Sequence, residues 1–219
     1  ETKGAGLKEN IKAYDLASAY PYVMYHLPDT SRGAWVEGDI ENEWWEWIAK
    51  RKPYTPGFAE ATIRFEEGLD WHPLVQKAST GTLVSPRFIT GWFTADELEE
   101  ARKWPHTHFI IGRWFYHHDD EPQYPFRNFI ERFYKIKMEA ANDPVAYRVA
   151  KVALNSIYGK TVQAVENVIG KLWNPFYSST ITGGTRARLA ELNRINGSQA
   201  VSFATDGVIL PTESPGIIS

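Results

Sequence analysis

Three short motifs, far apart along the chain, place the strongest constraint on its fold. Asp15 lies in AYDLASAYPYVM, Lys151 in KVALNSIYGK and Asp206 in SFATDGVIL. Two carboxylates suit Mg²⁺, and a basic helical face suits a triphosphate. Phosphoryl transfer needs little more from a protein, because its catalysis is mostly positioning and charge neutralisation. A fold that uses these motifs together must bring both ends of the chain to one cleft.

The pattern of apolar residues predicts both strands and helices. The expected strands are residues 11–15, 58–66, 82–93 and 108–117, and two more in 199–211 that meet at a tight turn around 205–207. A helix could begin after Asp15, and Thr94 with Glu97 forms a capping box that opens another. Further helices are expected at about 125–141, 144–164 and 180–195. This mixture predicts an α+β fold.

The helices at 125–141 and 144–164 form the second constraint. Asp143 is a natural N-cap and Pro144 a natural first-turn residue, and so short a connection makes the two helices antiparallel neighbours. One stripe of the second helix carries Lys151, Asn155, Tyr158 and Gly159. On the first helix of the pair, Lys135 is expected at about the same height along the helix axis as Lys151 on the second. Arg132 and Lys137 lie within one helical turn of Lys135. These cations could meet a triphosphate, although without the order of the motifs an ordinary solvated helix face is the better explanation.

Near the first motif, Asp15 ends an apolar strand, where a carboxylate can project toward a metal ion. The backbone N–H groups of Leu16, Ala17, Ser18 and Ala19 could receive phosphate oxygens. Asp206 lies at a hairpin turn, where aspartate is also a routine turn former. Taken singly, either aspartate could be structural, so the interpretation depends on their combination.

Composition narrows the class of protein. Apolar residues make up 43% and aromatic residues 14%, which indicates a folded chain. The net charge is −3, yet residues 127–171 hold eight bases against four acids, a plausible footprint for a polyanion.

The absence of cysteine excludes disulfides and fits a reducing compartment. No apolar run approaches the roughly 18 residues of a membrane span, so we expect no membrane partner and a cytoplasmic location. The chain opens with Glu1 rather than methionine, and we expect a section of a longer protein.

The three segments resemble motifs A, B and C of family B DNA polymerases, especially the protein-primed and mobile-element branch. Motif A, D-x-x-S-L-Y-P, is matched by Asp15, Ser18, Tyr20 and Pro21, with Ala19 in place of leucine. Motif B, K-x-x-x-N-S-x-Y-G, is matched in full by Lys151, Asn155, Ser156, Tyr158 and Gly159. Motif C, Y-x-D-T-D-S, keeps only Thr205 and Asp206; Ser202, Ala204 and Gly207 replace its tyrosine, first aspartate and serine.

The resemblance implies a role for each matched residue. Asp15 and Asp206 would bind two Mg²⁺ ions, one activating the primer 3′-hydroxyl and one holding the triphosphate. Lys151 would neutralise charge on the triphosphate, and Tyr20 would exclude a 2′-hydroxyl by collision. The nascent base pair would be lined by Asn155 and Tyr158. The segment ITGGTR resembles one that touches template and primer, and it adds candidate DNA-binding residues to two from motif B: Gly159, Lys160, Thr182 and Arg186.

The implied architecture is a polymerase palm, an antiparallel β-sheet backed by helices, with an antiparallel two-helix fingers subdomain. Residues 1–124 and 166–219 would form the palm and residues 125–165 the fingers. The implied partners are primer-template DNA and dNTPs, with a terminal protein or other replication proteins as further candidates. A virus, plasmid or mobile element would be the source. The alternatives are a catalytically inactive polymerase-like DNA-binding module, which Ala204 and the lack of flanking domains favour, and an RNA-making variant, which Tyr20 disfavours.

Two other groups of residues imitate functional sites. Asp39-Ile-Glu41 has the D-x-E form of a proofreading exonuclease, but in this family that motif precedes motif A, whereas here it follows. A cluster of histidines and acids could bind a transition metal, yet it lacks clean ligand spacing: His106, His108, His117, His118, Asp119 and Asp120. We expect neither an exonuclease site nor a metal there.

Overall fold

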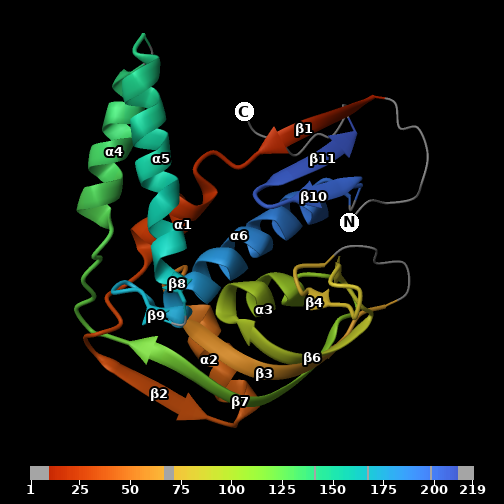
Figure 1. Cartoon of the computed structure of the whole chain (residues 1–219). Coiled ribbons are helices and arrows are strands. Elements are labelled where there is room, and N and C mark those ends of the chain that lie inside the picture. Colours follow the sequence, from red (N-terminus) through yellow and green to blue (C-terminus); the bar gives the residue numbers. More distant parts are fainter. Residues whose placement is uncertain (1–9, 67–71, 141, 167, 198, 212–219) are drawn as a thin grey trace.

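The computed structural model describes residues 10–211 except 67–71, 141, 167 and 198. The long helix α6 (Pro175–Ile195) crosses the middle of the molecule, between a three-stranded sheet and a four-stranded sheet. Two antiparallel helices, α4 (Arg127–Glu139) and α5 (Pro144–Thr161), project beyond these layers, as Figure 1 shows. The molecule therefore has a layered body and one helical arm.

The small sheet has the strand order β1-β11-β10 and is antiparallel throughout. It consists of β1 (Ile11–Asp15), β10 (Ser202–Ala204) and β11 (Gly207–Pro211). Val208 and Leu210 of β11 are buried against Leu189 of α6. Burial of these apolar side chains determines which face of the sheet packs on α6. It thereby also determines where the end of β1 lies.

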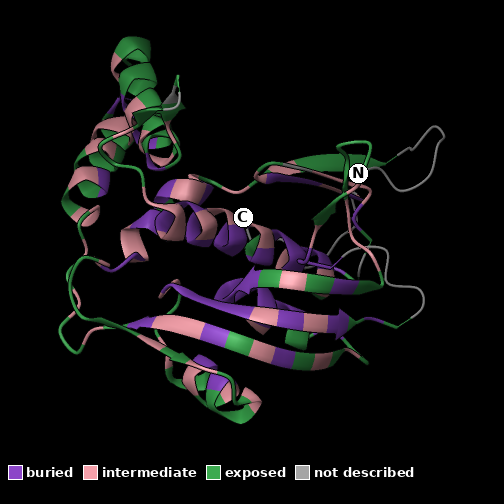
Figure 2. Ribbon diagram, turned by 60° about the horizontal axis from the view of Figure 1, so that its bottom comes forward, coloured by how far each residue is buried: buried purple, intermediate pink, exposed green. Residues whose placement is uncertain are grey.

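The larger sheet has the order β2-β7-β3-β6, also antiparallel, and its strands are β2 (Ala34–Gly38), β3 (Gly57–Arg64), β6 (Phe88–Thr94) and β7 (His108–His118). Figure 2 shows buried and exposed residues interspersed along β6 and β7, whereas β3 is exposed only at its last residue. The buried side chains pack against α2 (Glu41–Lys50) and α3 (Ala95–Arg102), whose Trp44 and Leu98 are fully enclosed. Two short hairpins complete the strands: β4 (Gln76–Lys77) with β5 (Leu83–Val84), and β8 (Ala164–Val165) with β9 (Val168–Ile169).

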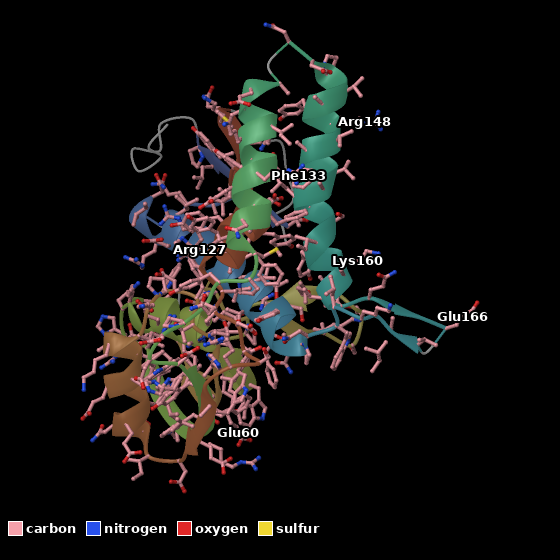
Figure 3. The ribbon with its side chains drawn as sticks, turned by 90° about the vertical axis from the view of Figure 1, so that its left-hand side faces the viewer. Glu60, Arg127, Phe133, Arg148, Lys160 and Glu166 are labelled. Carbon is pink, nitrogen blue, oxygen red and sulfur yellow. The ribbon has the colours of Figure 1, made fainter. Side chains whose placement is uncertain are left out.

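The arm consists of α4 (Arg127–Glu139) and α5 (Pro144–Thr161). The Asp143 carboxylate accepts hydrogen bonds from the amides of Val145 and Ala146, both 3.0 Å, so it caps α5 as its position predicts. The base of the arm packs on α1 (Ala19–His26) and α6 around Leu154 and Ile181. Figure 3 shows Arg148 and Lys160 on the outer side of α5.

The α+β class predicted from the sequence is confirmed, and most predicted elements are present. Five described elements lie outside the predicted set: β2, α2 and the short strands β4, β8 and β9. The run ENEWWEWIAK of α2 reads as an acidic stretch rather than a helix. The helix expected from about 180 begins at Pro175 instead. Its N-cap is Asn174, whose side chain accepts from two backbone amides at 3.1 Å, and Asn174-Pro175 is the local signal for this start. The second helix of the arm ends at Thr161, three residues early, where the β8–β9 hairpin follows. Among the described residues, no helix is both long and apolar enough to cross a membrane.

Candidate active site

Strand pairing brings the two motif aspartates together. In the antiparallel register of β1 and β11, Asp15 lies opposite Gly207, the neighbour of Asp206. The backbone amide of Leu16 donates to the carbonyl of Asp206 over 2.9 Å, which extends this pairing past the end of both strands. The Asp15 side chain is exposed and Asp206 is half-buried. Two carboxylates from opposite ends of the chain therefore lie at one edge of the small sheet, open to solvent.

The turn that carries Asp206 holds an unfavourable backbone conformation. Only Thr205 and Asp206 connect the paired residues Ala204 and Gly207. Thr205 has φ 53°, which a β-branched residue rarely adopts. Such positions cost on the order of 1–3 kcal/mol and cluster at functional sites. The turn therefore has a conformation that its sequence alone would not favour.

The segment after Asp15 forms a second wall of the site. Ser18 is the N-cap of α1 and has φ 53°, with no hydrogen bond from its side chain to the helix. The Ser18 hydroxyl instead accepts from Nζ of Lys137 on α4, at 3.1 Å. The Leu16 amide, also expected to receive a phosphate oxygen, donates to the Asp206 carbonyl in this structure. The amides of Ala17, Ser18 and Ala19 remain candidates.

Tyr20 lies between the aspartates and the arm. Its ring packs on Tyr158 of α5 at 4.5 Å between centroids, which joins motif A to motif B. Burial raises the pKa of the Tyr20 phenol, the nearby Tyr158 and Asp206 raise it further, and the Arg186 guanidinium partly offsets them. The Tyr20 hydroxyl therefore lies within electrostatic reach of both Asp206 and Arg186.

The remaining candidates on the arm are more dispersed. Lys151, Asn155 and Gly159 are exposed along α5, and Lys160 donates to the Gln163 side chain at 2.9 Å. Arg132 is exposed on α4, and Lys135 forms an exposed ion pair with Glu139 at 3.8 Å. Neither Arg132 nor Lys135 has a hydrogen bond to the motif A segment among the described residues. Lys137 makes that contact, although the sequence pattern placed it only within a turn of Lys135.

The two candidates on α6 differ in what they offer to a ligand. The Thr182 hydroxyl donates back to the carbonyls of Ser178 and Ser179, at 3.0 and 3.2 Å. The buried carboxylate of Glu97 on α3 forms an ion pair with the Arg186 guanidinium, 2.8 Å from Nε and 2.7 Å from Nη2. Glu97 was predicted only as part of the capping box that opens α3. Its ion-pair partner Arg186 lies 89 residues away in the sequence, so no local pattern could reveal this contact.

A cavity of about 280 Å³ adjoins these groups. Its wall includes Tyr20, Arg186 and Thr205, together with the apolar side chains of Leu189 and Phe203. Residues from motif A, motif C and α6 thus surround one space. The candidate site is a hollow lined by the Tyr20 ring, the Arg186 guanidinium and apolar side chains, and Thr205 in its wall precedes Asp206.

The donor set at the sheet edge fits magnesium. Asp15 and Asp206 offer hard carboxylate oxygens, and the exposure of Asp15 leaves room for water and phosphate ligands. Mg²⁺ is usually held by one or two carboxylates plus substrate phosphates, and it keeps several waters. Two aspartates at an open edge meet that requirement, and the alanine at position 204 does not remove it.

The two imitation sites have structural explanations. The Glu41 carboxylate accepts from the amide of Ile111 at 2.9 Å and from Nε1 of Trp45 at 3.1 Å, so it ties α2 to β7. The His117 ring is hydrogen-bonded to the carbonyl of Arg32 at 2.7 Å. His118 lies 3.3 Å from Asp120, a contact on the surface. Within the described ranges, no three potential metal-binding side chains converge.

Comparisons with known proteins extend these observations. Residues 2–171 match the family of type B DNA polymerases, organellar and viral. A probable DNA polymerase of Ascobolus immersus is 29% identical over 155 residues, and one of Neurospora intermedia is 27% identical over 159. Each match covers 69% of this chain but only 12% and 16% of the respective relative.

The fold is similar to that of Phi29 DNA polymerase. In an orthorhombic crystal form of that enzyme, the TM-score is 0.63 at 18% identity, over 90% of this chain and 38% of the other. Its ternary complex with primer-template DNA and incoming nucleotide gives a TM-score of 0.62 at 15% identity, with the same shares covered. The resemblance seen in the motifs is confirmed at the level of the family. The chain belongs to the organellar and viral type B DNA polymerases.

Proposed function

We propose that this chain forms the palm and fingers of a template-directed DNA polymerase. The palm would combine residues 1–124 and 166–219, and the arm at 125–165 would be the fingers. The substrates would be dNTPs and a primer-template, which Phi29 DNA polymerase holds in its ternary complex. The chain spans well under half the length of these relatives, so the proposal concerns the catalytic core of an intact protein.

One observation carries the proposal: the pairing of β1 with β11 joins motif A to motif C. The 2.9 Å hydrogen bond from the Leu16 amide to the Asp206 carbonyl holds the two aspartates at adjacent positions. Motif B joins them independently through the contact of the Tyr158 ring with the Tyr20 ring. Three motifs that are distant in sequence would have no reason to converge if each were only a local structural feature.

In the proposed reaction, each group has a task that its position allows. Mg²⁺ bound by Asp15 and Asp206 would neutralise phosphate charge and lower the pKa of the attacking hydroxyl. The backbone amides of Ala17, Ser18 and Ala19 would orient the triphosphate, with Lys151 and Lys137 supplying positive charge. Tyr20 would support the sugar of the incoming nucleotide, and Asn155 and Tyr158 would border its base. The chain's contribution is therefore preorganised binding.

The decisive experiment compares Asp15→Asn with Asp39→Asn in primer extension by the intact protein. Both changes remove one negative charge from an exposed aspartate, but only Asp15 lies at the candidate site. We expect Asp15→Asn to lower kcat by at least about 100-fold while primer-template affinity stays nearly constant, because carboxylate-bound metal acts on the chemical step. Asp39→Asn should behave as wild type.

The same experiment tests the alternative of a catalytically inactive DNA-binding module, which Ala204 in motif C favours. A wild-type protein that binds primer-template without extending it would support that alternative. Equal extension by wild type and Asp15→Asn would disprove the role assigned to the aspartate. Titration of the wild type and Asp15→Asn with Mg²⁺ in the absence of DNA provides a readout that is independent of activity.

A further inference from the structure

The carboxylate of Glu97 joins two parts of the fold at the margin of the site. Glu97 is only 3% exposed. Its Oε2 accepts hydrogen bonds from the Thr94 amide at 3.1 Å and the Thr94 hydroxyl at 2.8 Å. Its Oε1 accepts a hydrogen bond from Nε of Arg186 at 2.8 Å and lies 2.7 Å from Nη2 in the same ion pair. Each oxygen thus serves one partner, the helix cap on one side and the arginine on the other.

The corner that holds Glu97 is rigid. Helix α6 passes so close that a Cβ atom on Gly183 would lie 2.3 Å from the Thr94 hydroxyl oxygen. Thr94 itself is 4% exposed and caps α3, so it has little room to move. Arg186 follows Gly183 by one turn of the same helix. The ion pair with Glu97 therefore holds the Arg186 guanidinium in place relative to both α3 and α6.

The rest of the Arg186 guanidinium faces the candidate site. Its side chain is 36% exposed, and it lines the 280 Å³ cavity together with Tyr20 and Thr205. Its charge acts on the Tyr20 phenol, lowering the pKa that burial raises. Among the described residues, Nη1 has no hydrogen-bond partner. One edge of the guanidinium is thus bound by the protein while the remaining amino group is left for a ligand.

We propose that Glu97 is a positioning residue that holds Arg186 in place for a contact with a phosphodiester of the primer-template. This inference rests on the proposed polymerase function. A flexible arginine side chain loses rotamer entropy when it is fixed. Because the ion pair with Glu97 already restricts Arg186 in the folded protein, less of that entropy is lost on binding DNA. Glu97 therefore favours DNA binding although its own charge repels DNA.

A neighbouring ion pair provides the matched control. Glu100, one turn farther along α3, is also 3% exposed, and it accepts from Nε and Nη2 of Arg194 at 2.7 and 3.3 Å. Both pairs join α3 to α6, but Arg194 does not line the cavity beside Tyr20. A purely structural role for Glu97 predicts the same behaviour from both pairs. A positioning role predicts that only the Glu97 pair affects DNA.

The experiment measures primer-template Kd at several salt concentrations for Glu97→Gln and Glu100→Gln in the intact protein. Both variants remove one negative charge, so long-range electrostatics alone would tighten DNA binding in each. We expect Glu97→Gln instead to weaken binding roughly tenfold and to reduce the salt slope by about one. Its kcat at saturating DNA should stay within about twofold of wild type. Glu100→Gln should keep the wild-type Kd or bind slightly more tightly.

Two further measurements make the outcome decisive. Thermal unfolding of both variants measures how much stability is lost with each ion pair. Glutamine at position 97 can still form the capping box with Thr94. In an Arg186→Gln background, Glu97→Gln should no longer weaken DNA binding. A Kd for Glu97→Gln equal to or below that of wild type would overturn the inference and leave the polymerase proposal standing. Failure of the wild-type protein to bind primer-template would overturn both.

Discussion

At the scale of single residues, the candidate site combines side chains with unfavourable backbone conformations. Ser18 and Thr205, which flank the two aspartates in space, both have φ 53°. Neither is glycine, so the surrounding structure must supply the free energy that holds them. The pairing of β1 with β11 supplies it on one side, and the Lys137 contact with Ser18 on the other. The geometry of the site is therefore a property of the assembled fold.

Tyr20 allows a test at this scale. Replacing Tyr20 with alanine removes the ring beside Tyr158 and opens space where the sugar of an incoming nucleotide would lie. We expect the preference for dNTP over NTP to fall by at least about tenfold in Tyr20→Ala, because the clash with a 2′-hydroxyl disappears. Tyr20→Phe keeps the ring and should keep the preference. The measurement is the ratio of kcat/KM for paired nucleotides, and an unchanged ratio in Tyr20→Ala would remove the sugar-selecting role.

At the scale of elements, α6 organises the molecule. Its first half packs on α1 and α5 through Tyr177 and Ile181, and its second half supports the small sheet through Leu189. Between these contacts, Gly183 and Gly184 allow close approach to Thr94 and Tyr54. The glycines in ITGGTR thus have a packing role, whereas the resemblance of this segment implied DNA contacts only for Thr182 and Arg186.

Gly183 makes this packing testable. Alanine at position 183 would place its Cβ 2.3 Å from the Thr94 hydroxyl oxygen, so α6 must shift away from α3. We expect Gly183→Ala to lower the free energy of unfolding by about 1–3 kcal/mol, the usual cost of overpacking. Gly159 is the matched helical control, because a Cβ there meets nothing within 4 Å.

Gly159→Ala should raise the free energy of unfolding by up to about 1 kcal/mol, since alanine favours helix. Denaturant unfolding of the two variants distinguishes the cases. Equal stability changes at positions 183 and 159 would show that α6 tolerates a side chain where it approaches Thr94.

The elements that could be predicted are those with strong local signals. Asp143-Pro144 and the Thr94–Glu97 capping box set helix starts correctly, because their partners lie within one turn. The order of strands could not be predicted in the same way. Nothing in residues 11–15 indicates that they pair with residues 207–211, and only the family motifs suggested that Asp15 and Asp206 approach one another. Contacts such as Arg186 with Glu97 require the complete fold.

At the scale of the whole molecule, charge is distributed unevenly despite a net charge of only −3. Acids of α3 are paired with arginines: Asp96 and Glu99 with Arg51, Glu97 with Arg186 and Glu100 with Arg194. The cations of the arm lie on a projecting surface, where Lys151 is exposed. An anionic substrate approaching the site would therefore meet uncompensated positive charge mainly on the arm.

The link between arm and body leads to a prediction about the triphosphate. Lys137 donates to Ser18 at 3.1 Å, which places its ammonium beside the proposed phosphate-binding amides, whereas Lys135 points to Glu139 on the exposed surface. We expect Lys137→Ala to raise the KM for dNTP by roughly tenfold, because a charge-assisted contact to phosphate is lost. Lys135→Ala, which removes the same charge two residues away, should change KM by less than about twofold.

Steady-state kinetics at saturating primer-template separates the two lysines. Equal effects would mean that only the summed charge of the arm attracts the nucleotide. A larger effect at position 137 would mean that the arm delivers one cation to a defined position beside motif A. In that case any motion of α4 relative to α1 would change nucleotide affinity, because the Lys137 contact with Ser18 spans the two helices.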